Sequence, residues 1–305
     1  MPGAVAVGLT LNGAQHSALK DHLFPGDGLE AAAFLLCGVR AGDRRTRLVA
    51  REVFPVPYSA CSVRTDQRVT WPTDAILPLL ERAERSGGTL VKVHSHPGGY
   101  PAFSEVDDES DQQLLPSLRD WFDDDRPHAS AVMLPDGRMF GRIVGSDGEM
   151  RPLALINVAG NDLLFWHQGE TGGRPVPGFA ASHAQAFGEG TFDLLQRLSV
   201  AVIGCSGTGS PVIEQLARLG VGELVIVDDD TIEERNLNRI LNATAADVEA
   251  GRPKVAVLSE AVTHMGTGTQ VITLERSLWS PEAIEAVAQC DIVFGCMDMW
   301  IGVEC

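Results

Sequence analysis

The sequence predicts a two-domain α/β protein, and three observations support this fold class. A chain of 305 residues is long enough for two domains that each have a hydrophobic core. Residues 168–190, which include GETGGRPVPG, are rich in the residues typical of a linker. After this stretch, strands alternate with helices at the spacing of a parallel, Rossmann-like sheet. We expect a first domain at 1–158, a linker with the helix that leads into the second domain at 159–195, and a second domain at 196–305.

The composition narrows the class of protein. Lys and Arg number 24 against 41 Asp and Glu, a net charge of −17 that argues against nucleic acid as a partner. No run of eighteen apolar residues is present to span a membrane, and the N-terminus MPGAVAVGLTLNG lacks the features of a secretory signal. The six cysteines form no CxxC pair. We therefore expect reduced thiols and a cytoplasmic location.

The elements of each domain follow from periodicity and turn residues. In the first domain we expect helices at 15–23, 74–85 and 104–122, an apolar strand or helix at 30–36, and strands at 47–56, 89–96, 129–134, 138–144 and 152–159. Pro135–Asp136–Gly137 is typical of a hairpin turn. In the second domain we expect strands at 199–204, 223–228, 269–275 and 291–296, and helices at 211–220 and 254–262.

The stretch VKVHSHPGGYPAFSEVD contains a possible metal site. Side chains alternate along a strand, so His94 and His96 project from the same face. Asp107 follows in the first turn of the expected helix at 104–122. Two histidines, a carboxylate and a water make an open catalytic zinc site. The alternative is a polar strand end followed by a capping box, with Ser104 as the N-cap and Asp107 at N3.

The arrangement His94-x-His96, seven residues, Ser104-x-x-Asp107 resembles the motif of the JAMM metallopeptidases, also called JAB or MPN-type. Their motif also requires an upstream glutamate, which Glu30 in GLEAAAFLLCG supplies. Glu52 in REVFPV is the weaker candidate. The resemblance covers about residues 1–155 and implies an α/β domain of the cytidine-deaminase-like kind.

The resemblance implies a role for each of these residues. His94, His96 and Asp107 would hold Zn²⁺, which activates a water and polarises the scissile carbonyl. Glu30 would be the general base and then acid, and Ser104 would donate a hydrogen bond to the oxyanion. The bond cleaved would be an isopeptide or tail bond at the C-terminus of a ubiquitin-like protein.

The other six histidines lack the spacing of the metal motif. We expect surface or linker positions for His16, His22, His128, His167, His183 and His264.

A glycine-rich turn, VAVIGCSGTGS, follows the first strand of the second domain. Its glycines, Gly204, Gly207 and Gly209, have the spacing G-x-x-G-x-G. Backbone amides at such a strand-to-helix turn can bind phosphate, although a tight turn without a ligand remains an alternative. A nicotinamide-dependent dehydrogenase would instead need G-x-G-x-x-G.

The segment from Asp228 to Arg239 has the form D-x-D-x-I-x-x-x-N-L-x-R and resembles the ThiF-type adenylation domain of ubiquitin-activating enzymes and sulfur-carrier activators. The resemblance implies ATP and Mg²⁺ as cofactors and adenylation of a partner's C-terminal glycine. A ribose contact would come from Asp228, triphosphate contacts from Asn236, Arg239 and Lys254, and magnesium binding from Asp298. Asp230, the second acid of the motif, is a further candidate for the nucleotide site.

Two departures from the ThiF pattern are visible. His183 and Gln185 stand where these proteins commonly carry a phosphate-binding arginine, and Arg174 lies too far upstream. The chain ends at Cys305, shortly after Asp298, so we expect an incomplete second domain that is less stable than the first. Cys305 has no identifiable base partner, so the sequence does not support a thioester role for it.

Three interpretations of function remain open at this point. The leading one is a hydrolase that processes the tail of a ubiquitin-like protein, fused to a domain that activates such a tail, with a conjugating enzyme as a further partner. The second places both activities on a sulfur-carrier protein. The third is a scaffold whose ThiF-type half is inactive. A homodimer through the ThiF-type domain is compatible with each of them.

Overall fold

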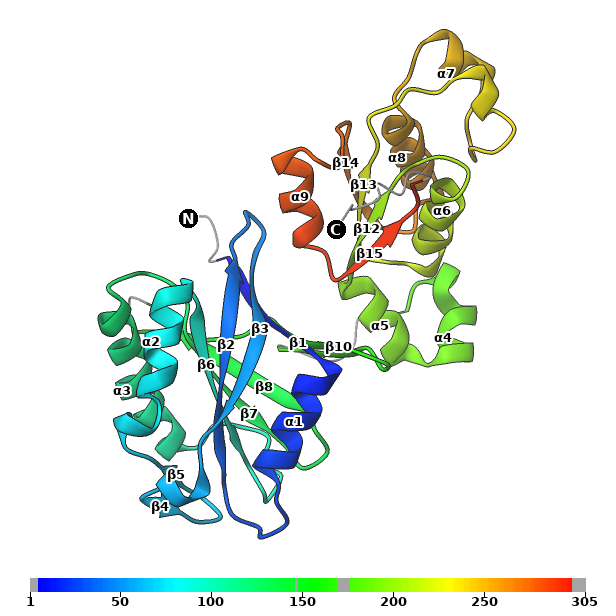
Figure 1. The fold of residues 1–305 in the computed structure, drawn as a ribbon. Coiled ribbons are helices and arrows are strands. Elements are labelled where there is room, and N and C mark those ends of the chain that lie inside the picture. The colour runs from blue at the N-terminus through cyan, green and yellow to red at the C-terminus, as the bar shows by residue number, and fades with distance from the viewer. Residues whose placement is uncertain (1–4, 146–147, 169–175, 298–305) are drawn as a thin grey trace. The chain divides into compact units, whose positions relative to one another are not determined.

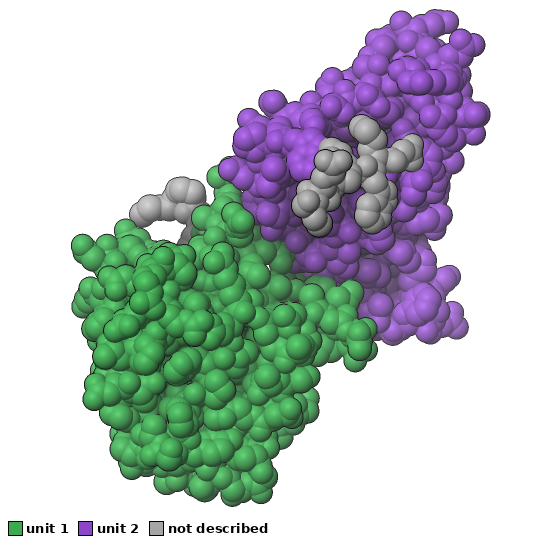
Figure 2. Space-filling view, in the orientation of Figure 1, with its two compact units in different colours: residues 1–171 green, residues 172–305 purple. Residues whose placement is uncertain are grey.

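The computed structural model describes residues 5–145, 148–168 and 176–297. The chain divides into two compact units, residues 1–171 and 172–305, which Figure 2 shows in green and purple. Both units contain strands and helices (Figure 1), so the predicted two-part α/β fold is confirmed. Asp298 and Cys305, as well as Arg174, lie outside the described residues.

The first unit is built on a mixed sheet of nine strands in the order β11-β10-β1-β3-β2-β6-β7-β8-β9. Strand β1 runs parallel to β3 and β10, and β6 runs parallel to β7, whereas the other neighbours are antiparallel. The strands are β1 (Ala6–Asn12), β2 (Ala32–Arg40), β3 (Arg45–Pro55), β6 (Thr89–Ser95), β7 (Ala129–Met133), β8 (Met139–Val144), β9 (Met150–Pro152), β10 (Leu155–Ala159) and β11 (Leu164–His167). A separate short hairpin joins β4 (Val63–Arg64) to β5 (Val69–Thr70).

Helices cover both faces of this sheet (Figure 1). Helix α1 (Gly13–Leu23) packs on one face, and α2 (Leu77–Ser86) and α3 (Glu105–Phe122) pack on the other. Strand β2 is buried on both sides, because Leu35 joins the core under α1 while Phe34 joins the core under α2 and α3. This burial explains why the sequence there is a continuous apolar run instead of an alternating one.

Three features of this unit differ from the sequence-based expectations. Strand β1, for which no expectation was made, lies in the middle of the sheet. Strand β11 pairs with β10 and so extends the sheet past residue 158. His128 is only 4% exposed, so the expected surface or linker position was wrong. Its Nδ1 accepts a hydrogen bond from the amide of Leu90 (3.1 Å), which ties the start of β7 to the start of β6.

The second unit contains a parallel sheet of four described strands in the order β14-β13-β12-β15. The strands are β12 (Ser199–Ile203), β13 (Glu223–Val227), β14 (Gln270–Leu274) and β15 (Ile292–Gly295). The helices are α4 (Ala181–Phe187), α5 (Glu189–Arg197), α6 (Gly209–Leu219), α7 (Ala245–Glu249), α8 (Lys254–Met265) and α9 (Pro281–Ala288). Among the described residues, no helix is both long and apolar enough to cross a membrane.

Candidate metal centre and nucleotide site

The candidate metal centre lies where β6 ends and α3 begins. His94 and His96 leave the end of β6 on the side of the sheet that α3 covers, while Val91 and Val93 face the core under α1. The end of β6 is fixed to the start of β2, since the amide of Ser95 donates to the Ala31 carbonyl (3.0 Å) and the Ser95 hydroxyl accepts from the Ala31 amide (2.9 Å).

Three polar side chains converge at this place. The Nε2 atom of His94 lies 2.8 Å from one carboxylate oxygen of Asp107, and Nε2 of His96 lies 3.3 Å from the other. The two Nε2 atoms are 3.2 Å apart. All three residues are buried, and they form a group whose ligand atoms lie within 4.8 Å of one another. The structure thus brings together the three side chains that the sequence analysis proposed as metal ligands, from the end of β6 and from α3.

The second nitrogen of His96 shows which tautomer faces the centre. Its Nδ1 lies 2.9 Å from the backbone carbonyl of Tyr100, an acceptor, so Nδ1 carries a proton and, when the imidazole is neutral, Nε2 offers its lone pair. Histidine ligands to zinc are typically oriented in this way. Two imidazole nitrogens and a carboxylate oxygen therefore fit Zn²⁺.

Burial and the neighbouring charges shift the pKa values of these groups. Burial opposes ionisation of Asp107, but hydrogen bonds from His94 and His96 outweigh it and hold the pKa of that carboxyl well below its usual range. Burial lowers the pKa of His94. Burial, reinforced by the charge of Asp107, raises the pKa of Glu30 to about 7. A carboxyl with a pKa near neutrality suits general base catalysis.

Ser104 is the N-cap of α3, as the capping-box interpretation predicted. Its hydroxyl oxygen accepts from the amide of Asp107 (3.2 Å), and its own amide donates to the Asp107 carboxylate (2.7 Å). The Ser104 hydroxyl also donates to that carboxylate, at 2.8 Å. The cap and the candidate ligand set are therefore one structure, because capping fixes the orientation of Asp107.

Glu30 is held beside the centre by residues that the sequence analysis did not single out. Its amide donates to the Thr65 carbonyl (2.7 Å), and its carbonyl accepts from Nε of Arg64 (2.9 Å). Arg64 in turn forms a bidentate ion pair with Asp27. Glu52, the weaker candidate, lies on β3 and pairs with Arg82 of α2.

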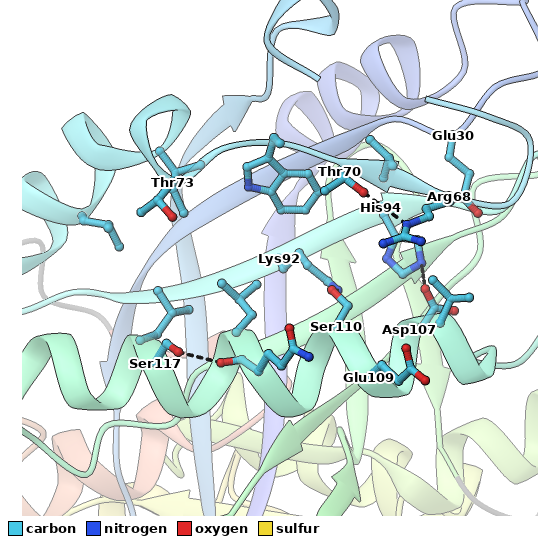
Figure 3. Close-up of a pocket in the computed structure, with 18 of the residues that line it drawn as sticks. Glu30, Arg68, Thr70, Thr73, Lys92, His94, Asp107, Glu109, Ser110 and Ser117 are labelled. Atoms are coloured by element: carbon cyan, nitrogen blue, oxygen red, sulfur yellow. Dashed lines mark hydrogen bonds and ion pairs between the residues drawn. The ribbon is translucent and has the colours of Figure 1, made fainter. Parts of the chain in front are cut away.

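Two cavities adjoin the centre. One, of about 420 Å³, is lined by residues that include Glu30, His94 and Asp107, together with Trp71 and Trp121. The other, of about 600 Å³, is lined by residues that include His96 and Ser104. Glu30 and Val106 line both cavities. Figure 3 shows Glu30, His94 and Asp107 grouped at one end of the first cavity.

The glycine-rich turn of the second unit requires two of its three glycines on steric grounds. A Cβ atom on Gly209 would lie 1.8 Å from the Gly204 carbonyl oxygen. Gly204 has a φ of +92°, and a Cβ there would lie 2.7 Å from the Cys296 carbonyl oxygen. Gly207 is different, because a Cβ there would meet only the side chain of Arg239, at 3.0 Å. The backbone thus folds tightly at the start of α6, as the spacing predicted.

Acidic and basic side chains surround this turn. The Asp228 carboxylate accepts from the Cys205 amide (2.6 Å) and from the Asp230 amide (2.9 Å), so it fixes the turn from the end of β13. Lys254, which is 4% exposed, places Nζ 2.6 Å from Asp230 and 3.5 Å from Asp228. The structure therefore gathers Asp228, Asp230 and Lys254 at the carboxyl end of the sheet, where ligands of such folds bind.

The remaining predicted nucleotide residues divide into two cases. Arg239 packs its aliphatic stem over Gly207, and its Nη1 donates to the Arg235 carbonyl (2.6 Å). Asn236 is buried, and its side-chain oxygen accepts from the Glu233 amide (2.9 Å), so it caps the turn at 234–236. Arg239 thus reaches the glycine-rich turn, whereas the observed contact of Asn236 is structural.

Comparison with protein families gives one match in each half of the chain. Residues 14–151 match the model of prokaryotic homologs of the JAB domain, and residues 180–302 match that of the ThiF family. The chain therefore contains a JAB-like domain followed by a ThiF domain. Both resemblances drawn from the sequence motifs are confirmed at this level.

Curated relatives of this chain include proteins named as adenylyltransferases. The ThiS adenylyltransferase of Escherichia coli is 36% identical over 99 residues, which are 32% of this chain and 39% of that protein. The SAMP-activating enzyme E1 of Haloferax volcanii is 36% identical over 32% of this chain and 36% of its own length. The zebrafish adenylyltransferase and sulfurtransferase MOCS3 is 34% identical over 34% of this chain and 22% of its own length. The chain spans less than half of each relative.

Solved structures with similar chains include the tRNA N6-threonylcarbamoyladenosine dehydratase TcdA of Escherichia coli in complex with ATP. It is 26% identical, with a TM-score of 0.36, over 39% of this chain and 48% of that chain. Another is MccB of Escherichia coli with ATP, at 26% identity and a TM-score of 0.34, over 39% of this chain and 38% of that chain.

Proposed function

We propose that the first unit is a zinc-dependent peptidase that cleaves a bond at the C-terminal tail of a ubiquitin-like or sulfur-carrier protein. The observation that carries this proposal is the convergence of His94, His96 and Asp107 in a buried group. The match to JAB-domain homologs supports it independently.

The chemistry follows from what each side chain offers. His94, His96 and Asp107 would hold Zn²⁺, which would supply Lewis-acid activation of a water and of the scissile carbonyl. Glu30, whose pKa is raised to about 7, takes the proton of the attacking water and passes it to the leaving amine. The hydroxyl of Ser104 turns from Asp107 to donate to the oxyanion, while the amide of Ser104 continues to hold Asp107.

The two cavities could hold the two parts of such a substrate separately, the extended tail in one and the amine component in the other. They share Glu30 and Val106, so an extended tail that lies in one cavity presents its last peptide bond beside Glu30. The amine component then lies in the other cavity. A peptide that fills both cavities excludes water from the scissile bond. The exclusion of water strengthens the electrostatic interactions at that bond.

Metal analysis combined with cleavage of a ubiquitin-like fusion protein tests this proposal. We expect zinc to copurify with the wild type and to be lost in His94→Ala. Glu30→Gln should keep zinc and lose cleavage by about 10²- to 10⁴-fold, the usual contribution of a general base. Glu52→Gln is the matched control, because Glu52 pairs with Arg82 instead of lining either cavity. Normal cleavage by Glu30→Gln, or a wild type free of zinc, would contradict the mechanism.

For the second unit we propose ATP binding and adenylation of the C-terminal glycine of the same tail. The carboxylate would attack the α-phosphorus, and the bond to the β-phosphate would break as pyrophosphate leaves. The tight turn at Gly204–Gly209, with Lys254 and Arg239 beside it, supports phosphate binding. Relatives named for activation of ThiS and SAMP suggest this class of partner. Magnesium binding by Asp298 stays part of the proposal.

Carrier-dependent exchange of pyrophosphate into ATP tests the second activity. Arg239→Ala and Lys254→Ala should abolish exchange, because each removes a cation from the glycine-rich turn. Arg235→Ala is the matched control: it lies on the same segment, and its side chain is mostly exposed and pairs with Glu233. Exchange that survives in both Arg239→Ala and Lys254→Ala would contradict the assignment.

The choice of carrier separates the two substrate classes. A ubiquitin-like modifier that is both cleaved and adenylated favours a role in conjugation, with a conjugating enzyme as the next partner. A sulfur carrier that is adenylated favours sulfur transfer, as the names of several relatives suggest. Cleavage without any exchange would favour an inactive ThiF domain. The absence of a CxxC pair is consistent with the cytoplasm as the site of these reactions.

We also propose a homodimer that forms through the second unit. Sedimentation analysis of the full-length chain would test it.

A further inference from the structure

A group of charged side chains is buried between α3 and the sheet, next to the candidate metal centre but without a role in the mechanism above. Lys92, Asp111 and Arg142 are 2%, 0% and 7% exposed. Buried charges are unfavourable unless they are paired and hydrogen-bonded. Asp111 pairs with both Lys92 and Arg142, and Asp108 at the edge of the group pairs with Arg142 as well.

Arg142 is the centre of the group. Its Nε and Nη2 lie 2.8 and 2.7 Å from one carboxylate oxygen of Asp111, whose other oxygen pairs with Lys92. The third nitrogen, Nη1, pairs with Asp108. The flat guanidinium also lies over the ring of Phe103, 3.6 Å from its centroid. Arginine suits this place because its planar fork can bind two carboxylates and an aromatic ring at once.

These contacts enclose the segment that carries the catalytic candidates. Phe103 precedes Ser104, Asp108 follows Asp107, and Asp111 lies one turn further along α3. On the sheet side, Lys92 lies two residues before His94 on the same face of β6, and Figure 3 shows it reaching toward α3. The group therefore joins the strand that carries the histidines to the helix turn that carries the carboxylate.

We propose that Arg142 and Asp111, with Lys92, are positioning residues that set the rotation and register of α3, so that the Asp107 carboxylate faces His94 and His96. This inference rests on the proposed zinc site. Apolar packing alone would hold the helix against the sheet, and buried ion pairs often add little stability compared with apolar residues of similar volume. The hydrogen bond from Nε of Arg142 to Asp111 is directional, and a ligand carboxylate needs a fixed direction. Residues that orient metal ligands typically change metal affinity by about 10- to 100-fold when mutated.

The test uses the full-length chain and measures zinc affinity by competition with a chelator, together with the visible spectrum of the Co²⁺-substituted protein. For Arg142→Met we expect zinc binding weakened by about tenfold or more and altered Co²⁺ bands, because Asp107 loses its fixed orientation. Arg142→Lys keeps the positive charge but lacks the planar guanidinium group. Its affinity for zinc should therefore lie between those of the wild type and Arg142→Met.

Arg119→Met is the matched control. Arg119 lies on the same helix, and its Nη2 anchors α3 to the end of the same strand β8 through the Val144 carbonyl (2.7 Å). It is three turns away from Asp107. We expect Arg119→Met to leave zinc affinity and the Co²⁺ spectrum unchanged, even where it lowers the melting temperature.

Asp111→Asn keeps the test decisive if Arg142→Met does not fold, because it is nearly isosteric and should also weaken zinc binding. Folded Arg142→Met or Asp111→Asn protein that binds zinc like the wild type overturns the inference while leaving the proposed function intact. A wild type that binds no zinc overturns the proposed function first, and the positioning role with it.

Discussion

The buried carboxyl of Glu30 links stability to function at a single residue. Burial is the main cause that raises its pKa from the usual 4.5 to about 7. Between these values the folded metal-free chain holds a proton that the unfolded chain has lost, so the free energy of unfolding falls as the pH rises. We predict that Glu30→Gln stabilises the metal-free protein at pH 8 by up to about 3 kcal/mol but leaves it unchanged at pH 4.

Urea denaturation in the presence of a chelator, at both pH values, measures this effect. Glu52→Gln should show no such gain, because its carboxyl forms a partly exposed ion pair. Equal stability of Glu30→Gln and the wild type at pH 8 would show that the Glu30 carboxylate is solvated.

His128 should respond to pH in the opposite direction. Burial lowers its pKa from 6.5 to about 4, so the folded state keeps the imidazole neutral where the unfolded state is protonated. Its contribution to stability is fully present above pH 6.5 and is lost as the pH falls towards 4. We predict that amide exchange in β6 and β7 accelerates over this range, and that His128→Gln, which keeps an acceptor for the Leu90 amide, flattens the dependence.

Hydrogen exchange followed by mass spectrometry at matched intrinsic rates measures this local opening. His264→Gln is the control, because that histidine lies in the other unit. If amide exchange in β6 and β7 of His128→Gln still accelerates as the pH falls, groups other than His128 cause the acid sensitivity.

Spacing in the sequence identified the side chains that meet at the candidate metal centre, but not those that support them. His94 lies at the end of strand β6, with His96 one residue past it, so strand periodicity places both imidazoles on one face before any tertiary structure is known. The capping pattern places Asp107 in the first turn of α3. Arg142 lies in an ordinary alternating strand, where a single charge is usually a surface residue. Only the packing of α3 on the sheet reveals that it is buried against Asp111. The wrong expectation for His128 has the same origin.

At the scale of elements, local patterns predicted what is local. The helices at 15–23, 74–85 and 104–122 correspond to α1, α2 and α3, because amphipathic spacing and caps are written in consecutive residues. Strand β1 is held by parallel pairing with β3 and β10, and its β10 partners lie almost 150 residues later along the chain. Such pairing leaves little trace in the sequence around it.

The glycine-rich turn gives a prediction at this scale. Gly209→Ala places a methyl group where the Gly204 carbonyl oxygen stands, so the turn must open. We predict a loss of about 1–3 kcal/mol or more in the stability of the second unit, together with loss of ATP binding. Gly207→Ala meets only the flexible side chain of Arg239 and should be tolerated.

Calorimetric titration with ATP, and chemical denaturation of both variants, measure these effects. The G-x-x-G-x-G spacing predicted the turn but not this difference between its glycines, which depends on backbone atoms brought close by folding. Equal effects of the two substitutions would mean that the turn relaxes around Gly209.

At the scale of the whole molecule, the two units have separate cores and separate candidate ligands. The cores of the first unit lie on either side of its nine-stranded sheet, and a core of the second unit includes Ala201, Val225 and Ala283. A ligand stabilises only the cooperative unit that binds it. Zinc should therefore act on the first unit and ATP on the second.

We predict two thermal transitions in the full-length chain, of which Zn²⁺ raises one and ATP with Mg²⁺ raises the other. A ligand at 100 times its dissociation constant adds about 2.7 kcal/mol to the unit that binds it. His94→Ala should lose the response to zinc and keep the response to ATP, whereas Lys254→Ala should do the reverse. The assignment of each transition can be checked by hydrogen exchange in β6 and in β12. A single transition that either ligand raises would mean that the units unfold as one, and that cleavage and activation of a tail are coupled through the fold instead of merely joined on one chain.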